Sequence, residues 1–253
     1  MKTDKDGLYD AHVHLQAYPK AILGSVMRRS RSAGVVRFKC CGTSPDDWDE
    51  VLRISNTEEG VEPSIGLHPW FVDEVGDDNW FEKLEEKLEE NSEAGIGEIG
   101  LDSTRGNLKG QKEAFLRQFE LAIKLKRHVS IHCVKAFGAL TNYLKSVADE
   151  LPEVLIHAPS MSLETWRELE PLGVMITIGP RVLHTASLKV SQLAMEVDPD
   201  RVLYESDSPY TCVHKCSVAA VGGFNSPETL PLVMAEVARL RKVKDNIVAV
   251  PPQ

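Results

Sequence analysis

The sequence lacks an apolar run long enough to cross a bilayer, and its first residues lack the apolar stretch of roughly 7–15 residues that marks a secretory signal. No low-complexity segment and no Pro/Gly-rich linker divides the 253 residues. Because 42% of them are hydrophobic, the chain can bury one large core. We therefore expect a soluble cytoplasmic protein with a single domain over residues 1–253.

Cysteine is scarce. Five cysteines in a chain of this length form neither a disulfide framework nor a set of zinc-binding pairs, and the odd number suits a reducing compartment. Cys40 and Cys41 are adjacent in an apolar run, so we expect core residues on opposite faces of a strand. Cys212 and Cys216 form a Cys-x3-Cys pair without a second pair, which indicates free thiols in a loop rather than a zinc site.

Positive charge is also in deficit, with 29 Lys and Arg against 38 Asp and Glu and a net charge of −9. This balance argues against a broad basic surface that binds nucleic acid without specificity. The densest charged stretch, residues 82–90, alternates Glu with Lys and Leu as the solvated face of a helix does. An anionic substrate would therefore be held locally, by metal ions and a few side chains. No membrane contact and no obligate protein partner is expected.

Eight short apolar runs alternate with segments of helical period along the whole chain. The runs lie near residues 8–15, 34–42, 62–68, 94–101, 128–134, 153–158, 173–179 and 201–207. The helical segments lie at 19–33, 45–58, 79–91, 109–127, 136–149, 162–171, 186–197 and 227–242. Strict alternation predicts parallel strands with crossover helices, and eight such units match a (β/α)8 TIM barrel. A doubly wound sheet is disfavoured because no Gly-rich phosphate loop follows the first strand.

Residues of the types that bind metals occur at or just beyond the ends of these runs: His12, His14, His68, Glu98, His132, His157 and Asp207. A lone histidine there is more often a hydrogen-bonded core residue, and a lone His-x-His can be two solvated side chains. Several strand ends that offer only His, Glu and Asp favour a metal centre, because barrel enzymes place their chemistry at the carboxyl ends of the strands. Glycines flank Glu98, and we expect them to leave space for a ligand or metal.

Six short motifs carry a family resemblance: Asp-Ala-His-Val-His at 10–14, Gly-Leu-His-Pro-Trp at 66–70, Gly-Glu-Ile-Gly-Leu-Asp at 97–102, Ile-His-Cys at 131–133, Ile-His at 156–157 and Glu-Ser-Asp-Ser-Pro-Tyr at 205–210. In order and spacing the chain resembles the TatD family of metal-dependent deoxyribonucleases, which belongs to the amidohydrolase-like metal hydrolases. The resemblance implies an eight-stranded barrel that usually holds two divalent metal ions, with Mg, Mn and Zn as candidates.

The resemblance also implies a role for each residue. His12, His14 and Asp207 would hold one metal, His132 and His157 the other, and Glu98 would bridge the two. Ions about 3.5–4 Å apart can share a hydroxide and polarise a phosphoryl oxygen, with Asp207 as the proton acceptor. His68 would lie near the scissile phosphate. Asp102 and Glu205 would orient ligands.

The chain departs from the family where substrate is bound. An arginine that commonly follows the histidine of the fifth strand is absent, as is a basic loop after the eighth strand, where residues 221–225 read Val-Gly-Gly-Phe-Asn. Lys135 and Arg181 are the candidate replacements. We therefore expect a phosphodiesterase or deoxyribonuclease that holds DNA weakly. The alternatives are a hydrolase of a small ester, lactone or amide, and a catalytically silent barrel that binds metal or nucleic acid.

Overall fold

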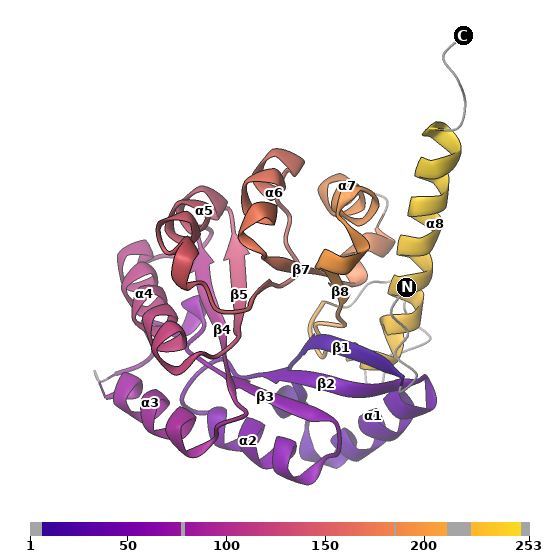
Figure 1. The fold of residues 1–253 in the computed structure, drawn as a ribbon. Helices are drawn as coiled ribbons and strands as arrows, with labels where there is room; N and C mark the ends of the chain where they lie inside the picture. The colour runs from indigo at the N-terminus through magenta and orange to yellow at the C-terminus, as the bar shows by residue number, and fades with distance from the viewer. Residues whose placement is uncertain (1–6, 77–78, 185, 212–223, 249–253) are drawn as a thin grey trace.

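The computed structural model describes residues 7–76, 79–184, 186–211 and 224–248. Eight parallel strands form one sheet in sequence order, with the helices in a ring around it (Figure 1). The strands are β1 (Leu8–Val13), β2 (Val35–Cys41), β3 (Val61–Ile65), β4 (Gly95–Asp102), β5 (Val129–Val134), β6 (Val154–Ile156), β7 (Met175–Ile178) and β8 (Val202–Tyr204). This arrangement confirms the predicted (β/α)8 barrel.

The main helices follow the predicted segments closely. They are α1 (Lys20–Ser32), α2 (Trp48–Thr57), α3 (Trp80–Glu90), α4 (Leu108–Leu125), α5 (Phe137–Ser146), α6 (Leu163–Leu169), α7 (Leu188–Glu196) and α8 (Leu230–Val248). Asn107 and Ser162 cap α4 and α6 by accepting hydrogen bonds from backbone N–H groups of the first turn. The strands β6 and β8 are shorter than predicted, since the residues after Ile156 and Tyr204 leave the ladder.

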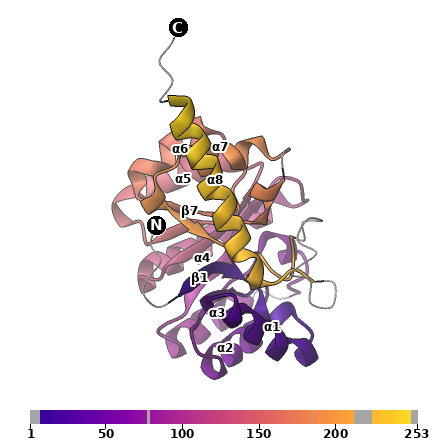
Figure 2. The same ribbon diagram turned by 90° about the vertical axis from the view of Figure 1, so that its right-hand side faces the viewer.

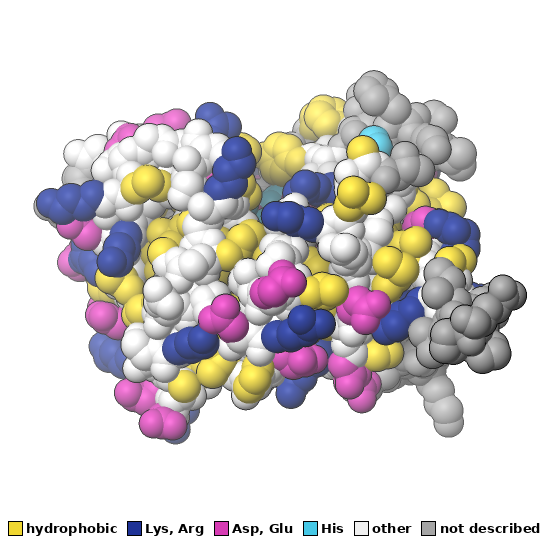
Figure 3. All heavy atoms as spheres, turned by 90° about the horizontal axis from the view of Figure 1, so that it is seen from above, with side chains coloured by type: hydrophobic (Ala, Val, Ile, Leu, Met, Phe, Trp, Pro, Cys, Tyr) yellow, Lys and Arg dark blue, Asp and Glu magenta, His cyan; other side chains and the backbone are white. Residues whose placement is uncertain are grey.

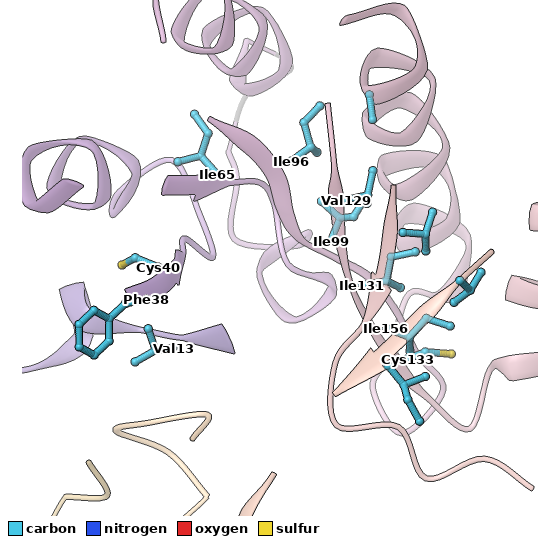
Figure 4. Packing of buried hydrophobic residues seen from close by; sticks show 14 of the residues in the cluster. Val13, Phe38, Cys40, Ile65, Ile96, Ile99, Val129, Ile131, Cys133 and Ile156 are labelled. Carbon is cyan, nitrogen blue, oxygen red and sulfur yellow. The ribbon is translucent and has the colours of Figure 1, made fainter. Parts of the chain in front are cut away.

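Side chains alternate between the barrel interior and the layer beneath the helices. On β5, Val129, Ile131 and Cys133 pack in the hydrophobic layer (Figure 4). Ser130 and His132, between them, face the interior, where the Ser130 hydroxyl lies 3.1 Å from a ring nitrogen of His12 on β1. The interior of the barrel near its carboxyl end is therefore polar.

A β-bulge in β4 turns Glu98 into this interior. Ile96 pairs with Val129 and Ile99 with Ile131, so two residues of β4 lie opposite one residue of β5. Both isoleucines belong to the outer hydrophobic layer although they are three residues apart (Figure 4). The extra residue shifts the alternation, so that Glu98 points inward.

The glycines beside Glu98 serve a purpose other than the expected one. A Cβ on Gly100 would lie 1.9 Å from the carbonyl oxygen of His132, and one on Gly97 would lie 2.8 Å from the Cβ of Ser130. The expectation that they leave space for a ligand or metal is wrong, because the space is filled by the neighbouring strand β5. They allow β4 and β5 to approach closely at the bulge.

Gly100→Ala is expected to lower the free energy of unfolding by at least about 2 kcal/mol, because the methyl group collides with backbone that cannot move aside. The φ of +152° at Gly100 adds to the strain. Urea denaturation measures the change. Gly138→Ala is the matched control, since the exposed Cβ position in α5 has no atom within 4 Å, and it should leave stability unchanged or raise it by about 0.4–1 kcal/mol. Equal stability of the two variants would contradict the packing argument.

The first and last strands meet through residues that lie beyond their ladders. The backbone N–H of His14 donates to Ser208 O at 2.8 Å, and that of Asp207 donates to His12 O at 3.1 Å. On the outside, α8 runs obliquely over this side of the barrel, and its carboxyl end extends past the neighbouring helices (Figure 2). None of the helices in the described ranges has both the length and the hydropathy needed to span a membrane.

Of the predicted core cysteines, Cys40 packs in the outer hydrophobic layer (Figure 4) and Cys41 faces inward, 3.5 Å from a ring nitrogen of His12. They therefore lie on opposite faces of β2, as predicted. Cys212 and Cys216, together with Val221, Gly222 and Gly223 of the altered loop, lie outside the described residues.

Candidate metal centre

The carboxylate of Glu98 is the centre of a histidine cluster at the carboxyl end of the barrel. Its Oε2 lies 3.2 Å from His12 Nε2 and 3.4 Å from His14 Nε2. Its Oε1 lies 2.9 Å from His157 Nε2, 3.0 Å from His132 Nδ1 and 3.3 Å from His68 Nε2. The two oxygens of one carboxylate thus face two separate groups of imidazoles.

Burial and charge make this cluster a place for cations. Glu98 is 3% exposed. Burial alone would raise the pKa of Glu98, but the imidazoles of His157, His68 and His12 hold it well below its usual range. Burial alone would lower the pKa of His157, yet the carboxylates of Glu98 and Glu205 raise it well above its usual value. The negative charge of these two carboxylates also favours a metal ion, which would displace the proton from the ring.

Contacts on the far side of each ring fix His12 in β1 and His14, which follows β1. His14 Nδ1 donates to the carbonyl oxygen of Cys41 at 2.7 Å. In the neutral ring the lone pair is then on Nε2, the nitrogen that faces Glu98. His12 Nδ1 lies 3.1 Å from the hydroxyl of Ser130. Burial lowers the pKa of His12 to about 3, with the nearby His157 acting in the same direction, so this ring is neutral and its Nε2 is able to bind a metal.

Carboxylates orient the two histidines of β5 and β6. His132 Nε2 lies 3.2 Å from Asp102 Oδ2, and His157 Nδ1 lies 3.5 Å from Glu205 Oε2. Glu205 Oε2 in turn accepts from Thr177 at 2.5 Å. Asp102 and Glu205 thus lie behind the rings of His132 and His157.

His68 differs from His14 in its tautomer. Its Nδ1 accepts a hydrogen bond from the backbone N–H of Trp70 at 3.2 Å. In a neutral ring the proton is then on Nε2, the atom that faces Glu98. Burial lowers the pKa of His68, which keeps the ring neutral. His68 therefore presents a hydrogen-bond donor to the cluster, whereas His14 presents a lone pair.

Asp207 lies at the edge of the cluster. Its Oδ1 is 3.6 Å from His14 Nε2, and its Oδ2 accepts a hydrogen bond from the hydroxyl of Thr211. The side chain is 15% exposed, against 4% for Glu98. Of the predicted acids near the cluster, Asp207 is thus the one that water can reach.

The geometry fits divalent metal ions. Two ligand atoms that each lie about 2.1 Å from a tetrahedral ion are about 3.4 Å apart. The distances of 2.9–3.6 Å between the ring nitrogens and the carboxylate oxygens have this magnitude. Neutral imidazoles and carboxylates suit Mg, Mn or Zn according to coordination number. Within 4.8 Å of one another, donor atoms group as His12, His14 and Glu98, as His68, Glu98 and His132, and as His12, His157 and Glu205.

The two candidate basic residues lie at the surface. Arg181 is exposed and lines a small pocket together with Asp207 and Glu205. Lys135 follows β5 directly and is exposed. Sequence reasoning gave no role to Asp10 or Trp70. Asp10 is fully buried and accepts from the backbone N–H of Ser206 at 2.9 Å, and its place two residues before His12 was the available signal.

Comparisons with known proteins identify relatives of this chain along most of its length. The sequence profile of the family described as TatD related DNase matches residues 9–250. The chain is 27% identical over 219 residues to the 3'-5' ssDNA/RNA exonuclease TatD of Cronobacter sakazakii, a match that covers 85% of this chain and 83% of the relative. It is 25% identical over 243 residues to YabD, an uncharacterized metal-dependent hydrolase of Bacillus subtilis, with 93% and 92% covered.

Solved structures share the fold. YJJV, a TatD homologue from Escherichia coli, superposes with a TM-score of 0.84 at 23% identity, with 92% of this chain and 90% of the other covered. A hydrolase of the TatD family from Entamoeba histolytica gives a TM-score of 0.83 at 17% identity, with 94% and 92% covered. The predicted enzyme class, a metal-dependent hydrolase of TatD type, is confirmed, and its alternatives are not favoured. Since the family profile covers nearly all of the sequence, this chain belongs to the TatD related DNase family.

Proposed function

We propose that this protein hydrolyses phosphodiester bonds in single-stranded nucleic acid, with two divalent metal ions held on the two sides of Glu98. The division of the histidines between the two oxygens of Glu98 carries the proposal. His12, His14 and Asp207 would hold one ion, and His132 and His157 the other. The name of the Cronobacter relative, an exonuclease of single-stranded DNA and RNA, supports the choice of substrate. The odd number of cysteines supports the cytoplasm as its location.

Bound divalent ions supply Lewis acidity, which polarises a phosphoryl oxygen and makes water a stronger nucleophile near neutral pH. The side chains supply position and proton transfer. Asp207 is the best proton acceptor, because its carboxylate is partly exposed at the edge of the cluster. Thr211 donates to Asp207 Oδ2, which leaves Oδ1 directed toward His14 and the cluster.

The test of this function is hydrolysis of a short single-stranded DNA, a p-nitrophenyl phosphodiester and a panel of esters and lactones, each with Mg, Mn and Zn. We expect metal-dependent cleavage of the DNA and of the phosphodiester that a chelator abolishes. Turnover of lactones or esters without cleavage of either phosphodiester would overturn the proposal.

His68→Ala is expected to keep the full metal content and to lower kcat/KM on phosphodiesters by roughly a hundredfold, as the loss of one oxyanion donor does. The reason is the tautomer, since the Nε2–H of His68 can donate to a phosphate oxygen but has no lone pair for a metal. Metal analysis and kinetics on a phosphodiester and on a carboxylic ester check this. Loss of metal would make His68 a ligand, and equal losses on both substrates would assign it a structural role.

Binding to DNA is expected to be weak and only shallowly dependent on salt. On the face shown in Figure 3, Lys and Arg side chains are interspersed with Asp and Glu side chains. With a net charge of −9, few phosphates can be neutralised at once. Titration of a labelled oligonucleotide at several salt concentrations gives the slope. A slope that corresponds to about six or more phosphate contacts would reveal an extended basic surface.

A further inference from the structure

Two exposed aromatic side chains lie against the histidine cluster: Tyr210, whose ring centroid is 5.2 Å from that of His14, and Trp70. Trp70 is 46% exposed, whereas the other three tryptophans, Trp48, Trp80 and Trp166, are at most 7% exposed. Its ring centroid is 5.2 Å from that of His68 and 6.0 Å from that of His132. A single exposed side chain needs no explanation by itself, but the position of Trp70 beside His68 and His132, at the rim of the centre, indicates a binding role.

The ring is held in place rather than free to rotate. Trp70 Nε1 donates to Asp102 Oδ2 at 2.7 Å, the same oxygen that lies 3.2 Å from His132 Nε2. Asp102 also fixes the loop that follows it, because its Oδ1 accepts from the backbone N–H of Thr104 at 2.9 Å and its carbonyl accepts from the N–H of Arg105 at 3.1 Å. Asp102 thus joins the tryptophan, the loop and a proposed metal ligand in one arrangement.

A single cation accompanies the ring. The guanidinium carbon of Arg105 lies 4.2 Å from the centroid of the Trp70 ring, as in a cation–π pair. Arg105 is itself exposed, so its remaining donors are open to an anion. The planar indole suits the base of a nucleotide, and the guanidinium beside it suits the phosphate. Both lie next to the proposed phosphodiester-cleaving centre.

We propose that Trp70 and Arg105 form a subsite for one nucleotide next to the scissile bond, with the base stacked on the indole–guanidinium pair and a phosphate bound by Arg105. This inference rests on the proposed function and names the part of the substrate that the chain recognises. Every base has a planar face, so such a subsite accepts all four bases. A base must be unstacked from its neighbours to enter, so the subsite selects single strands.

The kinetic test compares an oligothymidylate with an oligomer of the same length that carries abasic residues. The wild type should prefer the base-bearing oligomer by about 5- to 150-fold, the range that one stacked base gives. Trp70→Leu should remove this preference, and Trp70→Phe, which keeps a ring but loses the Nε1 donor, should retain it. An unchanged preference in Trp70→Leu overturns the subsite. Cleavage of neither oligomer by the wild type would instead contradict the proposed function.

Binding gives a second readout that needs no turnover. Because the other tryptophans are buried, quenching of the intrinsic fluorescence by a slowly hydrolysed phosphorothioate oligothymidylate reports on Trp70. Trp70→Phe should lose the quenching while it still binds the labelled oligomer, and Trp70→Leu should lose binding as well. Arg105→Gln should lower the slope of log affinity against log salt by about 1, whereas Arg28→Gln, which removes an equally exposed charge on α1, should leave the slope unchanged. Equal slopes in all three proteins would exclude Arg105 from phosphate binding.

Discussion

Glu98→Ala is expected to release both metal ions and to lower kcat/KM on a phosphodiester by on the order of a thousandfold or more, because bound metals supply several kcal/mol of transition-state stabilisation. Among the described residues, Glu98 is the one side chain that faces both groups of imidazoles, with Oε2 toward His12 and His14 and Oε1 toward the others. Its loss would therefore remove a ligand from each of the two proposed ions at once. Metal analysis of the purified variant, alongside kinetics, measures the effect.

The fold should tolerate this change better than the activity does. Without the Glu98 carboxylate the main cause of the raised pKa of His157 is gone, so that ring can become neutral instead of remaining a buried unpaired charge. Glu98→Gln keeps the volume of the side chain and serves as a companion variant where alanine leaves a cavity. Glu82→Gln on the exposed face of α3 is the control for loss of a surface charge. Full metal occupancy with wild-type turnover in Glu98→Ala would show that Glu98 is not shared.

Asp207→Asn is expected to retain the fold and part of the metal while it loses about 10²–10⁴ in kcat, the range that one general base contributes. An amide oxygen can still coordinate an ion, and the amide can still meet Thr211, but it cannot accept a proton from water. The loss should appear on a phosphodiester and on a carboxylic ester alike, since both need an activated water. This behaviour separates Asp207 from His68, whose removal should affect mainly phosphodiesters.

The matched control is Asp46→Asn, an exposed aspartate in the loop after β2. Metal stoichiometry must be measured on the same preparations, because a fall in turnover that follows metal loss would indicate a ligand and not a base. Unaltered turnover in a fully loaded Asp207→Asn protein would remove the proposed role altogether.

The order of the elements and the positions of the site residues could be predicted because both depend on local patterns. Apolar runs mark strands, and polar residues at the ends of parallel strands must converge on one mouth. His12 and His14 share a face by simple alternation, and in the structure the Nε2 atoms of the two rings are 3.2 Å apart.

The inward orientation of Glu98 could not be predicted from local patterns. Strict alternation from Ile96 would send Glu98 outward into the hydrophobic layer, and only the bulge opposite Ser130 brings it inside. A bulge depends on pairing between strands more than thirty residues apart, which no local pattern reveals. The flanking glycines are the sequence feature that accompanies the bulge, but the sequence alone suggests that they leave space for a ligand.

The exposure of Trp70 could not be predicted for a related reason. In the sequence it is one more aromatic residue in the Gly-Leu-His-Pro-Trp motif, and such residues are usually core residues. Its exposure follows from contacts with Asp102 and Arg105, which come from the next strand and the loop after it. Long-range contacts of this kind decide the surface of a barrel mouth, whereas the core follows from composition.

The hydrogen bonds between β1 and the segment after β8 would give the proposed metal centre a role in assembly. The backbone groups that join the two ends of the sheet belong to His12, His14, Asp207 and Ser208, three of which are proposed metal ligands. An ion held by them would act as a clasp between the first and the last strand, so metal affinity would add directly to the stability of the native state. Chelation should therefore speed amide hydrogen exchange first in β1 and β8, before it does so in β4 and β5, each of which pairs with a strand on both sides. Folding of the barrel would then be completed at the junction of the first and last strands, next to the proposed metal centre.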